Sequence, residues 1–201
     1  MIQKISDLGE VNLDEIIGRT LDRSRLDRYF ELLMDQNRQV NLVSRETSRA
    51  DFDRLVAESL LPLGQINLPR SNYLDIGAGG GIPAIPIMLS GAVSGETFLV
   101  ERTLKKARAL ESIVHGLGLN AVVLPKNFEE LHELPPLHLV TLRLVKPDQN
   151  LVSKVHDLLA PGGVFIYYSK LAGKASGFTR QAYTYHSAQD PVVKNLTIFK
   201  K

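Results

Sequence analysis

One short stretch of this sequence combines an acid with closely spaced glycines, residue types that suit the binding of a small polar molecule. Asp75 opens the pattern Asp-x-Gly-x-Gly-x-Gly, whose glycines are Gly77, Gly79 and Gly81. Glycine tolerates positive φ and lets a ligand approach the backbone, and Pro83 suits the first turn of a helix. The apolar residues around Asp75 and the proline after the glycines therefore predict a strand, a tight loop and a helix in that order.

The spacing of the glycines narrows the class of ligand. A dinucleotide fingerprint, Gly-x-Gly-x-x-Gly, would place its third glycine where the chain has Ile82. The Gly-x-x-x-x-Gly-Lys-Ser/Thr sequence of a phosphate-binding loop is absent. The compact loop resembles instead the first motif of the Rossmann-like methyltransferases, which bind S-adenosylmethionine (SAM). An ordinary glycine-rich turn that binds nothing is the alternative interpretation.

A second acid follows at the end of the next predicted strand. Glu101 closes an apolar run at roughly the distance, about 20 residues after the glycines, at which nucleotide-binding folds place a ribose-binding acid. A carboxylate there can accept both ribose hydroxyl groups in charge-assisted hydrogen bonds. Ribose binding fits adenosine, whichever cofactor carries it. A surface acid without a role is the alternative.

Composition limits the class of protein. The chain has 201 residues, 44% of them hydrophobic, which is enough for one core and favours one domain with a small extension. Cysteine is absent and the five histidines lack metal-ligand spacing, so we expect no metal site. The first residues lack a signal-peptide pattern and no apolar run could span a membrane. We therefore expect a cytoplasmic protein without membrane contact.

Charge is unevenly distributed along the chain. The net charge of +2 is too small to indicate nucleic-acid binding by itself. From Pro161 to the end, however, six Lys and Arg stand against one acid, Asp190. This basic part could bind phosphate, although solubility is the simpler interpretation. Between Arg19 and Arg28, arginines alternate with acids, which is typical of a solvated helix face with charge pairs.

The hydrophobic pattern predicts helices first and alternating strands and helices afterwards. Helical periodicity covers residues 13–40 and 52–63. The predicted strands are 73–77, 97–101, 121–124, 137–142, 164–169, 181–187 and 195–200, and the later helices are 83–90, 104–117 and 148–159. Alternation of this kind implies a mostly parallel sheet covered on both faces.

The fold class follows from this order of elements. We expect an α/β, Rossmann-like methyltransferase fold with a mostly parallel seven-stranded sheet and an antiparallel last strand. The last two strands follow each other without a helix and suit a hairpin at the sheet edge. Residues 1–70 would form an N-terminal helical extension and residues 71–201 the SAM-binding core of one compact domain.

Several segments, in their order along the chain, resemble one methyltransferase family. They are Asn41–Ser44, Asp75–Pro86 with its Gly-Ile-Pro-x-Ile-Pro helix start, Val100-Glu101 with Lys105–Ala107, Thr141–Arg143 and Tyr168–Lys170. Together they resemble the small-subunit ribosomal RNA methyltransferase G family, also called glucose-inhibited division protein B. That family methylates N7 of a guanine in 16S ribosomal RNA. The resemblance implies this activity, with SAM as cofactor and ribosomal RNA or the small ribosomal subunit as partner, and we expect a monomer.

The resemblance also implies which residues hold the cofactor. The glycine loop would pass beneath the methionine part of SAM with Asp75 near its amino group. Glu129 would lie beside the adenine, and Phe128 would either stack there or fill the core. The predicted cofactor-binding residues are Asp75, Gly77, Ala78, Gly79, Gly81, Ile82, Glu101, Arg102, Phe128, Glu129 and Arg143. The chain departs from the family pattern at Leu55, Glu58, Asn127 and His138, where the family has His, Asp, Arg and Asp.

Methylation of guanine N7 requires no general base from the protein. N7 offers a lone pair and the sulfonium of SAM is a strong methyl donor, so catalysis is positioning and exclusion of water. Arg143 closes the predicted fourth strand, where open α/β sheets hold ligands, and its guanidinium can bind guanine O6 or an RNA phosphate. Lys170 ends the fifth strand at the same edge. We predict both as catalytic residues; a solvated strand-end cation is the alternative for each.

Other functions remain open on the sequence alone. A SAM-dependent enzyme could act on another RNA, a protein or a small molecule, and a homologue could keep RNA binding with little activity. A nicotinamide oxidoreductase is a further alternative. A shift in melting temperature with SAM or with NADH would separate the cofactors, and RNA binding measured across salt would separate the substrates.

Overall fold

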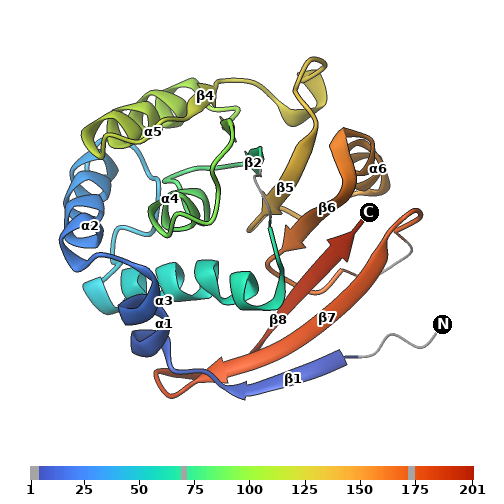
Figure 1. The fold of residues 1–201 in the computed structure, drawn as a ribbon. Helices are drawn as coiled ribbons and strands as arrows, with labels where there is room; N and C mark the ends of the chain where they lie inside the picture. Colours follow the sequence, from blue (N-terminus) through green and yellow to red (C-terminus); the bar gives the residue numbers. More distant parts are fainter. Residues whose placement is uncertain (1–4, 69–71, 172–174) are drawn as a thin grey trace.

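The centre of the sheet is built from the short apolar runs that the sequence marks as strands. The computed structural model of the protein describes residues 5–68, 72–171 and 175–201. The strands in these residues are β1 (Ile5–Glu10), β2 (Tyr73–Ile76), β3 (Thr97–Val100), β4 (Val122–Leu124), β5 (Leu137–Leu142), β6 (Leu159–Tyr167), β7 (Thr179–Ser187) and β8 (Asp190–Lys200). They form one eight-stranded sheet in the order β1-β7-β8-β6-β5-β2-β3-β4 (Figure 1). Among these strands, β8 alone runs antiparallel to its neighbours.

Four of the six helices in the described residues, the first three and the last, begin at a capping side chain. The six are α1 (Leu13–Thr20), α2 (Arg23–Asn37), α3 (Arg49–Leu60), α4 (Ala84–Leu89), α5 (Leu104–Gly116) and α6 (Gln149–Leu158), with short 3₁₀ turns η1 (Leu61–Gln65) and η2 (Phe128–Glu130). Asn12 caps α1 and Asp22 caps α2, each accepting hydrogen bonds from main-chain N–H groups of the first turn. Ser48 and Asp51 form a reciprocal capping box at the start of α3.

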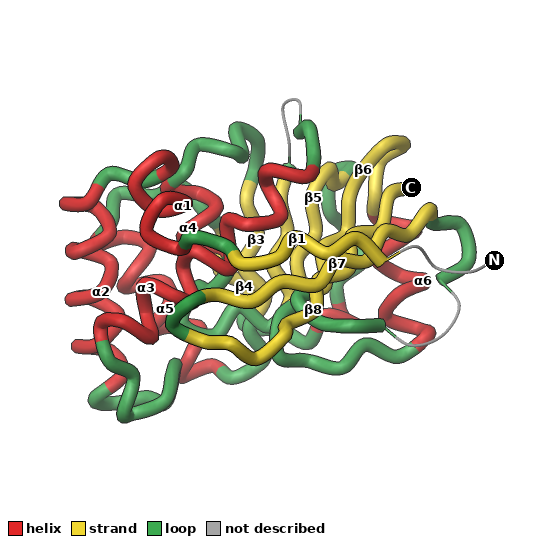
Figure 2. Tube along the Cα trace, turned by 90° about the horizontal axis from the view of Figure 1, so that it is seen from below, coloured by secondary structure: helices red, strands yellow, loops and turns green. Residues whose placement is uncertain are grey.

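Successive strand residues point to opposite faces of the sheet and enter separate apolar clusters. Tyr73 packs in the cluster that contains the buried faces of α1 to α5. Leu74, the next residue, packs in the cluster that contains α6. Figure 2 shows the resulting layers, with the sheet between a thick helical layer and α6. Burial on both faces explains why the central strands are continuous apolar runs.

The expected α/β architecture with a mostly parallel sheet and an antiparallel last strand is confirmed. The sheet has eight strands where seven were expected, because β1 pairs in parallel with β7, with Ile5 opposite Ala182. The sequence of β1 gives little signal because this edge strand is only partly buried. The helix expected over residues 13–40 is divided at Leu21 and Asp22, where Asp22 caps the second helix. The boundary expected at residue 70 stays a prediction.

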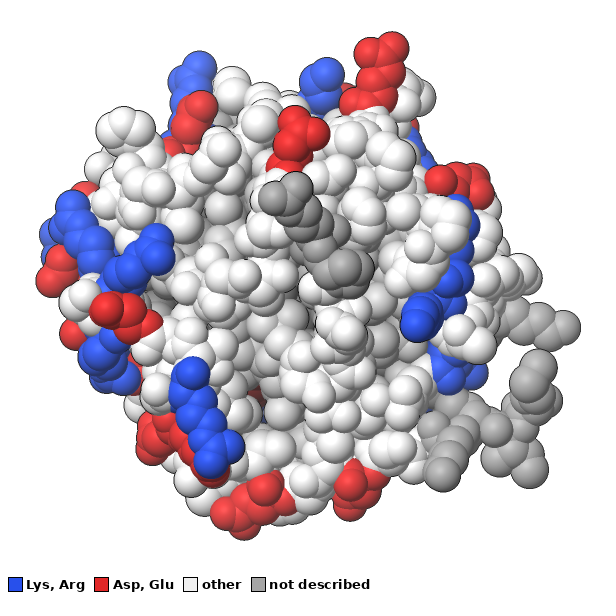
Figure 3. Space-filling model, in the orientation of Figure 1, with Lys and Arg blue, Asp and Glu red and all other residues white. Residues whose placement is uncertain are grey.

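The charge pattern of α2 is that of a solvated helix face. Its ion pairs include Arg23 with Asp27, at 3.5 Å, and Arg28 with Glu31, at 3.3 Å. Such exposed pairs contribute at most about 1 kcal/mol each. Figure 3 shows Lys and Arg beside Asp and Glu along the edge where Figure 1 places α2. Among the helices in the described residues, none is both long and apolar enough to cross a membrane.

The basic C-terminal part is not a continuous free surface. The Lys201 ammonium group donates to the carbonyl oxygens of His156 at 2.7 Å and Leu159 at 2.6 Å. Lys194 forms ion pairs with Glu58 and Asp190. These lysines therefore join elements of the fold, and the count of six cations overstates the charge available to a phosphate partner.

Candidate active site

The glycine loop connects β2 to α4 at the carboxyl edge of the parallel strands. Gly77, Gly79 and Gly81 have φ angles of +73°, +52° and +92°, a region that other residues rarely adopt. A Cβ atom at Gly81 would also collide with the side chain of Ile85. The Gly77 N–H group donates to the Val100 carbonyl at 2.8 Å, which ties the loop to the end of β3. The alternating glycines therefore serve a turn that other residues would strain.

Side chains from the N-terminal region support this loop from behind. The Tyr29 hydroxyl donates a buried hydrogen bond of 2.9 Å to the carbonyl oxygen of Gly80. A Cβ atom at Gly80 would lie only 2.8 Å from Leu33 Cδ1 and 3.3 Å from Leu42 Cβ. The loop is thus held against α2 and the segment that follows it, so the N-terminal helices are part of the construction of the site.

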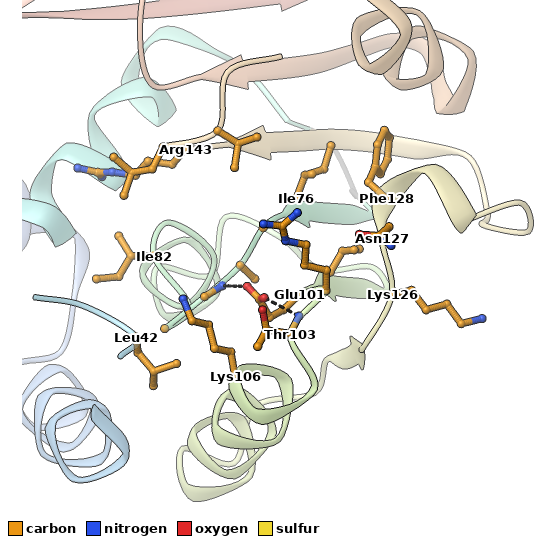
Figure 4. A pocket seen from close by; sticks show the side chains of 18 of the residues that line it. Leu42, Ile76, Ile82, Glu101, Thr103, Lys106, Lys126, Asn127, Phe128 and Arg143 are labelled. Carbon is orange, nitrogen blue, oxygen red and sulfur yellow. Dashed lines mark hydrogen bonds between the residues drawn. The ribbon is translucent and has the colours of Figure 1, made fainter. Parts of the chain in front are cut away.

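Glu101 follows β3 with its carboxylate turned toward the glycine loop (Figure 4). The residue is 7% exposed. Its Oε2 accepts the Gly79 N–H group at 3.2 Å, and its Oε1 accepts the Thr103 N–H group at 2.8 Å. Each carboxylate oxygen can accept more than one hydrogen bond. These bonds orient the carboxylate and leave capacity for further donors, and its burial does not fit a surface acid without a role.

A pocket of about 470 Å³ opens beside the loop, bounded by residues that follow β3, β4 and β5. Its volume lies within the range of small-molecule sites. The predicted residues that line it are Gly77, Ala78, Gly79, Ile82, Glu101, Arg102, Phe128, Glu129 and Arg143. Residues without a predicted role also line it, among them Leu42, Val43, Leu55, Thr103, Lys106, Lys126, Asn127, Leu144 and Val145. The tertiary structure thus brings most of the predicted residues into one pocket.

Cations outnumber acids in the pocket lining. Besides Arg143, the lining includes Arg102, Lys106 and Lys126, none of which forms an ion pair with any other described residue. Lys106 extends toward the glycine loop, whereas Lys126 points away from the pocket (Figure 4). A concave surface with surplus positive charge attracts anionic partners.

Arg143 directs its guanidinium group toward α3. Its Nη2 donates to Glu58 Oε2 at 2.6 Å, and its Nη1 donates to the Leu55 carbonyl at 3.3 Å and to Ser59 Oγ at 3.4 Å. The side chain is only 11% exposed. The alternative interpretation of Arg143 as a solvated cation is therefore wrong. Its role in catalysis stays a prediction.

Asp75 lies inside the fold and is not part of the pocket lining. Its Oδ1 accepts the Thr141 hydroxyl at 2.5 Å, and the Thr141 oxygen shares a second hydrogen bond of 2.7 Å with the Tyr73 hydroxyl. Its Oδ2 has no hydrogen-bond partner among the described residues. Burial raises the pKa of Asp75 to about 7, against the opposing effects of the Thr141 hydrogen bond and the Arg143 charge. The predicted contact of Asp75 with the cofactor stays a prediction.

The remaining predicted residues lie in different surroundings. Gly81 and Lys170 are outside the lining, and Lys170 is exposed beyond β6. Phe128 lines the pocket and also packs in the cluster around α6, so it fills part of the core, and its stacking on the adenine stays a prediction. Glu129 is exposed at the pocket edge. Within the described residues, no group of three or more His, Asp or Glu side chains could hold a metal ion.

Some of the missed lining residues had a signal in the sequence and others had none. Leu42, Val43 and Lys106 lie in segments that carry the family resemblance, so a role for them could have been inferred. Leu55 is one apolar residue of a helix, and Leu144 and Val145 follow a strand without any distinctive spacing. Their place in the site depends on how α3 packs against the end of β5.

Comparison with known proteins identifies related sequences over most of the chain. Residues 22–198 match the family described as rRNA small subunit methyltransferase G. The ribosomal RNA small subunit methyltransferase G of Acidiphilium cryptum is 31% identical over 173 residues, which cover 82% of this chain and 79% of that protein. The protein of the same name from Chlorobium phaeobacteroides is 33% identical over 158 residues, covering 77% and 70% of the two chains.

Comparison with solved structures identifies the same architecture at low sequence identity. The O-methyltransferase from Bacillus cereus, solved in complex with SAH, superimposes with a TM-score of 0.61 and 16% sequence identity. The superposition covers 94% of this chain and 100% of that one. At this identity the likeness shows the Rossmann-like methyltransferase fold alone.

Proposed function

This chain belongs to the rRNA small subunit methyltransferase G family, and we propose on that premise that it methylates N7 of a guanine in 16S ribosomal RNA. It is a SAM-dependent ribosomal RNA methyltransferase, and SAM is its cofactor. Family membership sets aside the nicotinamide oxidoreductase as an alternative. The proposal concerns the target atom and the part that each pocket residue takes in the reaction.

Family membership supports the target, and the observation that carries the assignment of the pocket to SAM is the buried Glu101 carboxylate. Main-chain N–H groups of Gly79 and Thr103 already orient this carboxylate, so little ordering is needed when ribose hydroxyl groups replace water there. The adenine would lie toward Asn127 and Phe128, which line the same pocket. The methionine part would then follow the glycine loop toward Arg143.

The residues of the pocket would position the reacting groups and exclude water from them. When bound, SAM supplies a methyl group on a positively charged sulfur. Leu55, Leu144 and Val145 line the same pocket and would offer apolar surface against the flat face of a guanine, which helps to exclude water. N7 already carries a lone pair, so none of these residues has to remove a proton. Arg143 would hold an oxygen acceptor of the target nucleotide.

Unpaired cations in the lining support a nucleic-acid substrate. Arg102 and Lys106 would neutralise phosphates of an RNA bound over the pocket, and Lys126, which points away from the pocket, would contact a more distant phosphate. These contributions weaken as salt rises. We propose the cytoplasm, where ribosomal RNA is available, as the place of action.

Two measurements test the proposed function. Calorimetry should detect binding of SAM and no binding of NADH. Purified protein should transfer radiolabelled methyl groups to 16S ribosomal RNA from cells that lack this enzyme, and mass mapping should place the label at N7 of one guanine. Methylation at another base atom, or of a protein instead of RNA, would overturn the proposal while leaving SAM as the cofactor.

A further inference from the structure

One buried carboxylate beside the pocket forms ion pairs with three cationic side chains. Glu58 of α3 has a side chain only 5% exposed and faces Arg143, which follows β5, and Lys194 of β8. Its Oε2 accepts Arg143 Nη2 at 2.6 Å. Its Oε1 accepts the Lys194 ammonium group and lies 3.5 Å from Arg54 Nη1. Asp190 joins the cluster through Lys194 at 2.8 Å and Arg54 at 3.6 Å.

The contacts fix the orientation of the Arg143 guanidinium group. Its bonds to Leu55, Glu58 and Ser59 all come from α3 and hold one side of the planar group. Its carbon lies 5.4 Å from the centre of the Tyr168 ring. The Tyr168 hydroxyl in turn donates to the Ser59 carbonyl at 2.7 Å. The Arg143 guanidinium group is therefore fixed by hydrogen bonds to α3 and by its contact with the Tyr168 ring.

Part of the guanidinium group stays available to a ligand. A guanidinium has five N–H donors, and the bonds from Nη1 and Nη2 to α3 use three of them. The others have no hydrogen-bond partner among the described residues, and Arg143 lines the pocket. Glu58 thus binds one side of the Arg143 guanidinium group, and the remaining N–H groups can donate to an acceptor on a ligand.

The cluster is a network of charges and not a single ion pair. Arg54 also pairs with Asp51, at 3.3 Å, so the three cations Arg54, Arg143 and Lys194 meet the three acids Asp51, Glu58 and Asp190. Buried ion pairs are weak sources of stability, because desolvation offsets much of their attraction. The position of this network is what suggests a function, because its member Arg143 also lines the pocket.

We propose that Glu58 is a positioning residue for methyl transfer and acts through Arg143. It holds the guanidinium so that the free N–H groups face an oxygen acceptor of the target nucleotide. Lys194, anchored by Asp190 on β8, occupies the other Glu58 oxygen and fixes the carboxylate in turn. This inference rests on the proposed function, because it assigns an additional residue to the same reaction.

The variant that tests the proposal is Glu58→Gln, which keeps the shape of the side chain and removes its charge. We expect kcat for methyl transfer to ribosomal RNA to fall by roughly ten- to a hundredfold, because small misplacements are costly in such reactions. SAM affinity should stay within about twofold, since Glu58 does not line the pocket. The matched control is Glu31→Gln, which removes an exposed acid that pairs with Arg28 and should leave kcat unchanged.

A double-mutant cycle separates positioning from a general structural role. In an Arg143→Ala background, Glu58→Gln should cause no further loss of kcat, because the residue through which it acts is absent. An equal loss of kcat in both backgrounds, or an unchanged kcat for Glu58→Gln alone, would overturn the inference. If Glu58→Gln does not fold, Ser59→Ala replaces it. That variant removes one Arg143 contact without changing charge and should lower kcat several-fold in the wild-type background only.

The outcome can be told apart from failure of the proposed function. If the wild-type protein methylates a different RNA or a different atom, the proposed target is wrong, but the same cycle can be run on the true substrate. If the wild-type protein methylates 16S ribosomal RNA as proposed and the cycle shows no coupling, the inference about Glu58 alone fails.

Discussion

The end of the pocket at Glu101 is built mainly from main-chain atoms, whereas the end at Arg143 is built from charged side chains. At the first end, Gly79 and Thr103 orient one carboxylate through their N–H groups. At the second, Glu58 is held among Arg54, Arg143 and Lys194. Under the proposed function, the first end would bind the cofactor and the second would contact the RNA.

This difference predicts how each end responds to substitution. Main-chain bonds persist when a neighbouring side chain changes, so damage at the Glu101 end should stay confined to the removed group. In the cluster at Arg143, each ion pair orients the next, so loss of one member should be felt by its partners. The four experiments below test that contrast.

The largest expected effect is that of Arg143→Ala. Loss of the guanidinium should lower methyl transfer to ribosomal RNA by roughly a hundredfold or more and leave SAM affinity within about twofold. Arg143→Lys should restore little, because a point charge cannot replace the planar fork. Single-turnover methylation and calorimetry measure the two quantities. Loss of SAM binding would place Arg143 in the cofactor half of the pocket and remove the contrast.

The next effect in size is that of Glu101→Ala. Loss of charge-assisted bonds to the ribose should weaken SAM binding by roughly 2 kcal/mol, about thirtyfold. At saturating SAM, methyl transfer should recover most of its rate. Calorimetry provides the measurement, and Glu111→Ala, which removes an exposed acid of α5, is the control. Unchanged affinity in a folded Glu101→Ala protein would refute the ribose assignment.

A smaller effect concerns pH and the buried Asp75. Its pKa of about 7 lies above the ordinary value of 3.8, so the folded state holds a proton that the unfolded state releases. The favourable contribution of this group to stability therefore declines as pH rises toward 7 and is lost above it. Between pH 6 and pH 8, the wild-type protein should lose about 1.4 kcal/mol of stability relative to Asp75→Asn. Urea denaturation of both proteins at the two pH values measures this difference, and a parallel pH dependence would contradict the raised pKa.

The smallest effect is expected for Leu144→Gly at the pocket mouth. Leu144 has a φ of 62° and is 96% exposed. Glycine relieves the backbone strain but gains freedom in the unfolded chain, so the free energy of unfolding should change by less than about 1 kcal/mol. Urea denaturation measures this change. A larger loss would show that Leu144 packs against the fold. A fall in RNA methylation without loss of stability would instead support the proposed contact between Leu144 and the target guanine.

The cofactor end could be predicted from the sequence because its parts are close together along the chain. Gly79 and Glu101, which share a hydrogen bond, are 22 residues apart. A strand, a glycine loop, a helix and a second strand follow one another along the chain and together form the cofactor site. The glycines with positive φ and the acid at the end of the second strand therefore have a recognisable spacing in the sequence. The same local rules placed the central strands and the helices between them.

Only the tertiary structure decided the surroundings of Arg143 and the place of β1. Glu58 lies 85 residues from Arg143 and 136 from Lys194, and nothing in the local sequence of any of the three predicts that they meet. β1 forms a strand because it pairs with β7, which lies near the other end of the chain and would otherwise be the edge of the sheet. No local pattern records such pairings, because an ion pair or an edge strand depends on which surfaces the packed helices and sheet bring together.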